Sequence, residues 1–159
     1  MLKPSAYLSD RRVVDLKSTT KIDALEELIE SIGKDDVADR NLFFRAVVSR
    51  EKVMTTGVGD GIAIPHARIP QVKNPFLAIG RSAKGIEYGS VDGKPVQIVI
   101  LIGASDKQTS LYLQLLSRSL FLFTEEPLRK KILKASGAKD VIRILGEAES
   151  ESSAASRKS

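Results

Sequence analysis

One apolar run limits the possible folds of this chain more than any other feature of its sequence. It extends from Val96 to Ile102, and five of its seven residues are Val or Ile. Branched side chains favour extended backbone, and a strand with apolar residues at consecutive positions has both of its faces covered. A second apolar run, residues 76–80, can form a neighbouring strand. We therefore expect a sheet inside the protein, with helices packed on both of its faces.

Helical patterns alternate with these extended segments. Apolar residues recur at helical spacing over residues 22–32, between Thr20 as an N-cap and Gly33 as a stop. Asp39 is suited to cap a second helix, which ends close to Arg50. Further helices are expected over residues 106–123, from residue 124 onward, and over residues 138–145. This alternation indicates the α/β class, with a small mixed β-sheet flanked by helices on both faces.

The chain of 159 residues is long enough for one domain with a sizeable core. We place that single domain at residues 1–146. Residues 147–159 consist only of Glu, Ala, Ser, Arg and Lys and show no apolar periodicity. Such a composition cannot bury an apolar face, so we expect these residues to form a disordered C-terminal tail.

Composition excludes several classes of function. The chain has no cysteine, which rules out disulfides and thiolate metal sites, and its single histidine argues against a zinc site, so neither metal nor cofactor is predicted. The net charge of +5 comes from Lys and Arg interleaved with acids, and aromatic residues make up 5%, which does not favour nucleic-acid binding. No apolar run reaches the ~20 residues of a membrane span. The first residues do not form a secretory signal either, so a cytoplasmic protein without membrane insertion is expected.

The residues with distinctive chemistry lie between positions 50 and 68, where the only histidine, His66, occurs. Three glycines at alternate positions precede it and let the backbone turn or approach a bound group closely. They are Gly57, Gly59 and Gly61. The apolar residues 62–64 predict a short buried strand, which Pro65 should end because proline has no N–H to donate. His66 is therefore predicted on a loop, just beyond the end of a strand.

Several side chains near His66 in the sequence are suited to hold a phosphoryl group. Arg50 lies at the end of the preceding helix, and Thr55 and Thr56 add two hydroxyls. A nucleophilic imidazole, a guanidinium, hydroxyls and exposed amides together form a set that can bind phosphate. Arg50 has an alternative role as a cation that the dipole favours at a helix C-terminus. The glycine segment fits neither a Walker A loop nor a Rossmann fingerprint, because neither Gly-Lys-Ser/Thr nor a helix follows it.

This stretch resembles the phosphorylation site of the IIA domains of the bacterial phosphoenolpyruvate-dependent sugar phosphotransferase system. The resembling residues are 49–52, 56–57, 59 and 61–66. The resemblance covers residues 8–145 and is greatest to the fructose/mannitol type (EIIA type 2) and its nitrogen-regulatory branch. It implies the α/β fold of that family, and it implies that Nε2 of His66 accepts a phosphoryl group from an HPr-like phosphocarrier protein. Onward transfer to an EIIB domain, or a signal to a regulated target protein, would follow.

The resemblance also assigns roles to other residues around His66. It implies that Arg50 stabilises the phosphoryl group, with Thr55, Thr56, Gly59 and Gly61 in support. Members of the family commonly carry a second histidine that faces the phosphorylated one, whereas the matching position in this chain is Tyr112. A phenol can donate a hydrogen bond but carries no positive charge near neutral pH. Tyr112 could instead be an ordinary half-buried tyrosine on an amphipathic helix.

Three other interpretations of His66 remain open at this stage. The chain could be a regulatory binding module that senses phosphorylation without passing it on. His66 could act as the general base of a hydrolase or lyase, although no companion nucleophile such as a Gly-x-Ser-x-Gly elbow is present. A lone histidine could also be purely structural.

Overall fold

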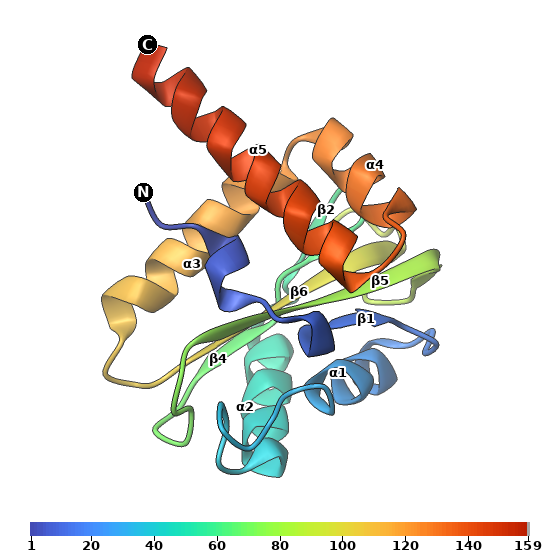
Figure 1. Ribbon diagram of the computed structural model, residues 1–159. Helices are drawn as coiled ribbons and strands as arrows, with labels where there is room; N and C mark the ends of the chain where they lie inside the picture. The colour runs from blue at the N-terminus through green and yellow to red at the C-terminus, as the bar shows by residue number, and fades with distance from the viewer. Residues whose placement is uncertain (159) are drawn as a thin grey trace.

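The computed structural model describes residues 1–158, and residues 154–158 by their backbone alone. The elements in chain order are η1 (Pro4–Tyr7), η2 (Asp10–Arg12), β1 (Val13–Asp15), α1 (Lys21–Ile29), α2 (Arg40–Val53), β2 (Gly57–Gly59), β3 (Ile62–Ala63), β4 (His66–Arg68), β5 (Phe76–Ile86), β6 (Val96–Ala104), α3 (Thr109–Phe123), α4 (Glu126–Lys134) and α5 (Ala138–Lys158). Figure 1 shows one sheet between two layers of helices.

The sheet has six strands in the order β1-β5-β6-β3-β2, and β4 pairs with β6 beyond the end of β3. Strands β5 and β6 are antiparallel, as are β2 and β3. The pairs β1 with β5, β3 with β6 and β4 with β6 are parallel. The mixed sheet and the α/β class predicted from the sequence are thus confirmed.

Strand β6 is the apolar run expected at the centre of the fold, and both of its faces are covered. Val99 and Leu101 pack in one cluster with apolar side chains of α1 and α2. Ile98, Ile100 and Ile102 pack on the opposite face with side chains of α3, α4 and α5. All five are at most 1% exposed. Full burial of such side chains stabilises the fold by about 1.5–3 kcal/mol each, which explains why helices cover both faces of the sheet.

Local hydrogen bonds decide where the helices begin. Asp39 caps α2 as predicted, because its carboxylate accepts a hydrogen bond from the amide three residues later. Thr20 lies at the N-cap of α1, but its hydroxyl makes no capping bond. Helix α3 begins at Thr109 rather than at residue 106, because the Ser105 carbonyl accepts from the Gln108 amide and closes a turn first.

Pro65 does not end the ladder of strand pairing, so the predicted loop position of His66 is wrong. Ile62 pairs with Ile98 and His66 pairs with Ile102, which is one unchanged register on both sides of the proline. The Pro65 carbonyl accepts a hydrogen bond from the Ile102 amide at 3.0 Å. A proline lacks only the donor, so the chain can resume its pairing immediately afterwards, and His66 is the first residue of β4.

Helix α5 continues through residues that we expected to form a tail from position 147. It extends to Lys158, and residue 159 lies outside the described residues. Glu149 is fully buried, and its carboxylate accepts hydrogen bonds from the Ser5 amide at 2.7 Å and from the Ser5 hydroxyl. The Ser152 hydroxyl accepts from Arg118 on α3 at 3.2 Å. The two chain ends lie on the same side of the molecule (Figure 1), and these polar contacts hold α5 where no apolar periodicity predicted a helix.

Candidate functional site

His66 lies at an edge of the sheet, on the side that faces α3. Ile62 and Ile64 belong to the apolar cluster under α3, α4 and α5, whereas Ala63 and Ala67 belong to the cluster under α1 and α2. Side chains alternate between the two faces of a strand, so His66 projects on the same side as Ile62 and Ile64. Among the described residues, β4 pairs only with β6, which leaves its other edge without a neighbouring strand.

The imidazole of His66 has one nitrogen held and the other free. Its Nδ1 lies 2.7 Å from the Ile64 carbonyl oxygen. A carbonyl can only accept a hydrogen bond, so Nδ1 carries the proton, and Nε2 keeps a free lone pair. Burial lowers the pKa of His66, and the positive charge of Arg50 lowers it further, against the opposing effects of the Ile64 carbonyl and the Glu51 carboxylate. The half-buried imidazole is therefore a neutral nucleophile near pH 7.

Arg50 reaches this site from the last turn of α2. One of its guanidinium nitrogens donates to the Met54 carbonyl at 2.9 Å, which fixes the side chain beside the segment that follows the helix. The positive charge of Arg50 lowers the pKa of both His66 and Tyr112, so its guanidinium lies within electrostatic range of the two side chains. The guanidinium that the sequence predicted as a partner of His66 thus acts on the imidazole through its charge, and its contact with a phosphoryl group stays a prediction.

Tyr112 lies on α3 with its ring against His66. The two ring centroids are 5.7 Å apart and the planes meet at 63°, an edge-on arrangement. Burial raises the pKa of the Tyr112 phenol to about 12, although Arg50 and Arg68 oppose the rise. The phenol therefore keeps its proton at neutral pH, and its hydroxyl can donate a hydrogen bond. The position expected to face His66 does face it.

Glu51 belongs to the site region, although its place in the sequence predicts no role for it. It is 6% exposed, and its carboxylate accepts from the Thr56 amide and hydroxyl, from the Tyr88 hydroxyl at 2.8 Å and from the Lys21 ammonium at 3.1 Å. This network fixes the chain that leads from α2 to the β2–β3 hairpin. The only sequence signal for a role of Glu51 is that an acid stands next to the predicted Arg50. Its partners Lys21 and Tyr88 are too distant in the sequence to be predicted.

The two threonines expected to contact a phosphoryl group have different environments. Thr56 is 3% exposed, and its hydroxyl is bonded to Glu51, so Thr56 supports the segment instead of donating to a ligand. Thr55 is only partly buried, and its hydroxyl oxygen accepts from the Gly57 amide at 3.1 Å. The hydroxyl proton of Thr55 remains available, so Thr55 is the one of the two that can still act as a donor.

The glycines expected at the site form a hairpin turn some distance from His66. Gly59 and Gly61 have φ values of 101° and 77°, which only glycine adopts without strain, on either side of the turn residue Asp60. Ile62, next to this turn, pairs with β6 four residues before His66 does, a separation of about 13 Å along the strand. Gly59 and Gly61 therefore shape the β2–β3 hairpin and do not touch the imidazole.

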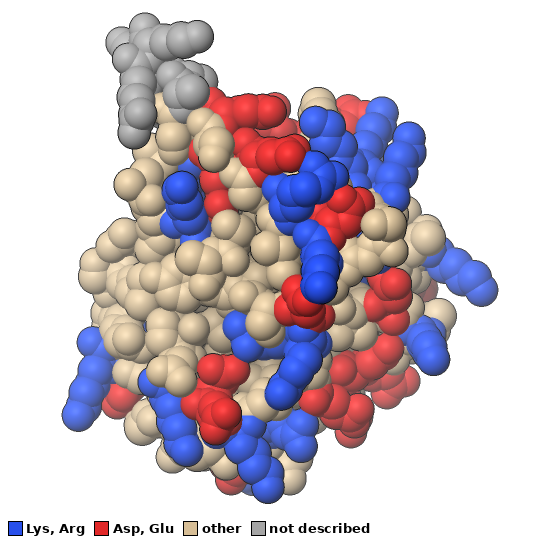
Figure 2. Space-filling model, in the orientation of Figure 1, with Lys and Arg blue, Asp and Glu red and all other residues tan. Residues whose placement is uncertain are grey.

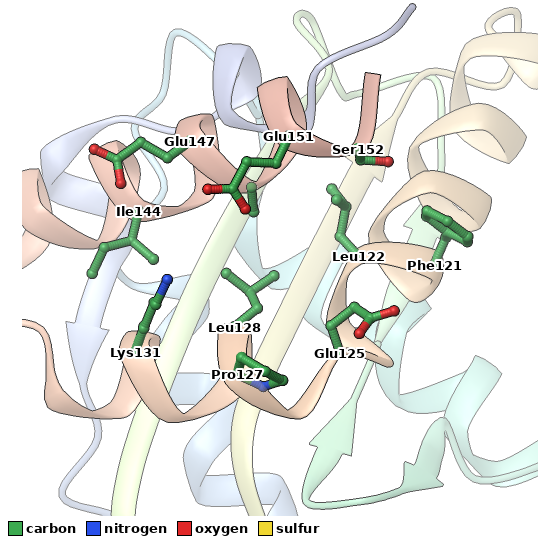
Figure 3. A pocket seen from close by; sticks show the side chains of 11 residues that line it. Phe121, Leu122, Glu125, Pro127, Leu128, Lys131, Ile144, Glu147, Glu151 and Ser152 are labelled. Atoms are coloured by element: carbon green, nitrogen blue, oxygen red, sulfur yellow. The ribbon is translucent and has the colours of Figure 1, made fainter. Parts of the chain in front are cut away.

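A cavity of about 530 Å³ lies between α3, α4 and α5 and is separate from His66 (Figure 3). Phe121 and Leu122 line it from α3, Leu128 from α4, and Ile144 from α5, with Glu151 at its rim. Phe121 follows Tyr112 by nine residues, which places the cavity about 14 Å along α3 from the ring beside the imidazole. This cavity is therefore not part of the candidate site at His66.

The face of the molecule drawn in Figure 2 carries mixed charge. Lys and Arg are interspersed with Asp and Glu, and an uncharged area lies over α3, so this face has no basic groove for nucleic acid. Within residues 1–158, no three or more His, Cys, Asp or Glu side chains gather to hold a metal ion. No helix in that same part of the chain is both long and apolar enough to cross a membrane.

Comparison with known proteins gives consistent matches along most of the chain. The family model described as "Phosphoenolpyruvate-dependent sugar phosphotransferase system, EIIA 2" matches residues 8–148. The PTS system fructose-specific EIIABC component of Bacillus subtilis is 35% identical over 84% of this chain, which spans only 21% of that relative. The nitrogen regulatory protein of Bradyrhizobium diazoefficiens is 31% identical, over 82% of this chain and 85% of its own. The crystal structure of nitrogen regulatory protein IIA-Ntr from Neisseria meningitidis superposes with a TM-score of 0.83 at 27% identity, over 89% of this chain and 97% of that one.

Proposed function

Because this chain belongs to the EIIA type 2 family of the phosphoenolpyruvate-dependent sugar phosphotransferase system, we propose that it carries a phosphoryl group on Nε2 of His66. The observation that supports this most is the hydrogen bond between Nδ1 and the Ile64 carbonyl. It fixes the tautomer in which Nε2 has a free lone pair, on a sheet edge that a partner protein can approach. A purely structural histidine has no need of a free nitrogen at that edge.

The chemical step follows from this geometry. The Nε2 lone pair attacks the phosphorus of a phosphohistidine on an HPr-like carrier, so that a new N–P bond forms as the carrier's N–P bond breaks. The electron pair of the broken bond returns to the carrier's imidazole. Nδ1 of His66 keeps its proton and continues to donate it in the hydrogen bond to the Ile64 carbonyl. The negative charge of the bound phosphoryl group balances the positive charge of the ring.

Three side chains are our candidates for assisting the transfer. Arg50 can pair with the equatorial oxygens of the phosphoryl group as charge develops on them, and its charge keeps the imidazole neutral beforehand. The Tyr112 hydroxyl and the Thr55 hydroxyl can each donate one further hydrogen bond. Because the phosphoryl group must be transferred onward, these contacts are most useful if they stabilise it more in the transition state than on phosphorylated His66.

The test uses the fact that the chain contains one histidine. The protein is incubated with phosphoenolpyruvate, its kinase and the general phosphocarrier protein, and the wild type is compared with His66→Ala by intact-mass spectrometry. We expect one phosphoryl group on the wild type and none on the variant, with an adduct that acid hydrolyses and base does not. An acid-stable adduct, or equal labelling of the variant, would refute the assignment.

Onward transfer decides between a transport role and a regulatory role. The Bacillus subtilis relative is by name an EIIABC protein, so we propose an EIIB domain as acceptor. The likeness to nitrogen regulatory proteins supports the second candidate, a protein whose phosphorylation state is sensed by a regulated target. Mixing the phosphorylated protein with a purified EIIB domain separates the two: loss of phosphate from His66 to EIIB supports transport, and retention supports the regulatory role.

A further inference from the structure

Arg68 and His66 lie side by side and face the start of α3. They are two residues apart on β4, and alternate residues of a strand project on the same face. Ala67 between them is 6% exposed and packs in the cluster under α1 and α2. The other face, which Arg68 shares with His66, is the face that α3 covers.

Arg68 ties β4 to the first turn of α3. Its guanidinium donates one hydrogen bond to the Asp106 carbonyl at 3.1 Å and another to the hydroxyl of Thr109. Thr109 is the first residue of the helix. An exposed arginine normally keeps much of its rotamer freedom, which costs free energy to restrict. Because Arg68 makes two hydrogen bonds to the same turn, its side chain is restricted to the rotamer that reaches both acceptors.

The same guanidinium contacts the aromatic ring beside the imidazole. Cζ of Arg68 lies 5.8 Å from the centroid of Tyr112, within the range of cation–π attraction. Thr109 and Tyr112 are three residues apart on α3 and therefore share one helix face. The Tyr112 ring thus contacts both Arg68 and His66, whose ring centroid lies 5.7 Å away.

We propose that Arg68 is a positioning residue for phosphoryl transfer at His66, and that it acts by holding the Tyr112 ring against the imidazole. The inference rests on the proposed function of His66. Without the guanidinium, the half-buried Tyr112 side chain loses its cation–π contact, and the first turn of α3 loses its tether to β4. The Tyr112 hydroxyl then no longer has a fixed direction toward a group on Nε2.

The first experiment compares phosphorylation rates of Arg68→Met, Arg68→Lys and Lys107→Met. Lys107 is an exposed cation in the turn that Arg68 contacts, and no hydrogen bond of its side chain occurs in the described part of the chain, so it controls for the loss of one charge near the site. We expect Arg68→Met to slow transfer roughly five- to tenfold, from the loss of a cation–π contact and a hydrogen-bonded tether. Arg68→Lys should retain part of the rate, and Lys107→Met should match the wild type. A Lys107→Met rate as low as that of Arg68→Met would overturn the proposal.

A double-mutant cycle tests whether Arg68 acts through Tyr112. In a Tyr112→Leu background the ring is absent, so a further Arg68→Met change should have little additional effect on the rate. Independent effects that multiply in the double variant would overturn the proposal. Equal melting temperatures of the variants would show that unfolding does not cause the loss.

A spectroscopic readout separates failure of this inference from failure of the proposed function. The single histidine gives isolated imidazole NMR signals, and the nuclear Overhauser effect between the His66 and Tyr112 rings reports their contact without any phosphorylation. We expect this effect to weaken in Arg68→Met and to persist in Lys107→Met. An unchanged effect in Arg68→Met would refute the positioning role. Absence of phosphorylation in the wild type would refute the proposed function instead, and the ring contact alone would then decide the role of Arg68.

Discussion

Replacement of Glu51 by alanine is expected to destabilise the protein strongly and to loosen the segment that leads from α2 toward the site. Glu51 is almost fully buried, and its carboxylate is the shared acceptor for Thr56, Tyr88 and Lys21. Alanine removes that acceptor and leaves the donors facing a low-dielectric interior. The segment after α2 then has no fixed anchor.

The size of the effect follows from these partners. Removal of one member of a buried charged network costs roughly 3–5 kcal/mol, because the remaining groups stay desolvated and unpaired. The Lys21 side chain is 22% exposed and can turn toward water, which puts the expected loss near the lower limit, about 3 kcal/mol. In a domain of this size each kcal/mol shifts the melting temperature by about 2–4 °C, so Glu51→Ala should melt on the order of 10 °C lower.

Thermal and urea denaturation followed by circular dichroism measures this loss. Glu126→Ala is the matched control, because Glu126 is an exposed carboxylate that only pairs with Lys130 one turn away on α4. Such surface pairs contribute little, so the control should melt like the wild type. Tyr88→Phe removes one donor and keeps the carboxylate, so its melting temperature should fall between the two. A Glu51→Ala melting temperature close to that of Glu126→Ala would refute the anchoring role.

Other predictions concern the site and the chain ends. Arg50→Met should raise the pKa of His66 in an NMR titration, since the charge of Arg50 helps to lower it, and should slow phosphoryl transfer by about tenfold or more; an unmoved pKa would place Arg50 outside the site. In the wild type, the phosphorylation rate should stay level as pH falls to the ordinary histidine pKa of ~6.5, and a decline already above that pH would contradict a lowered pKa. The imidazole binds its proton at higher pH in the unfolded chain than in the folded one. The contribution of His66 to the free energy of unfolding is therefore fully present above pH ~6.5 and decreases below it. Tyr112→Phe should slow transfer roughly three- to tenfold at unchanged melting temperature, and a wild-type rate would exclude the hydroxyl. Glu149→Ala should abolish hydrogen-exchange protection of the Ser5 amide, and retained protection would show that the contact is dispensable.

The parts of the fold that the sequence predicted depend on local patterns of apolar residues. The run from Val96 to Ile102 predicted a strand covered on both faces, and β6 has that environment. Asp39 predicted the start of α2 because a cap bonds within its own turn. His66 could be singled out because it is the only imidazole, and the family resemblance rested on the residues next to it, which the matching family model supports.

The parts that could not be predicted depend on partners distant in the chain. Pro65 signals the end of a strand locally, and only the pairing with β6 reveals that the register continues past it. The polar segment after position 147 lacks a pattern of its own, and Ser5 at the other end of the chain is what makes burial of Glu149 possible. Arg68 likewise gains its role from α3, about 40 residues later.

The open edge that carries His66 also bears on how copies of this protein avoid pairing with one another. An unpaired strand edge offers amides and carbonyls to any extended segment, and a long one promotes aggregation. Strand β4 is only three residues long, and its successive residues direct their amides alternately toward β6 and toward the open edge. A foreign strand therefore finds too few consecutive donors to add stably. A partner that needs only the half-buried imidazole requires no row of backbone donors, so the shortness of β4 leaves His66 accessible without promoting the addition of a strand.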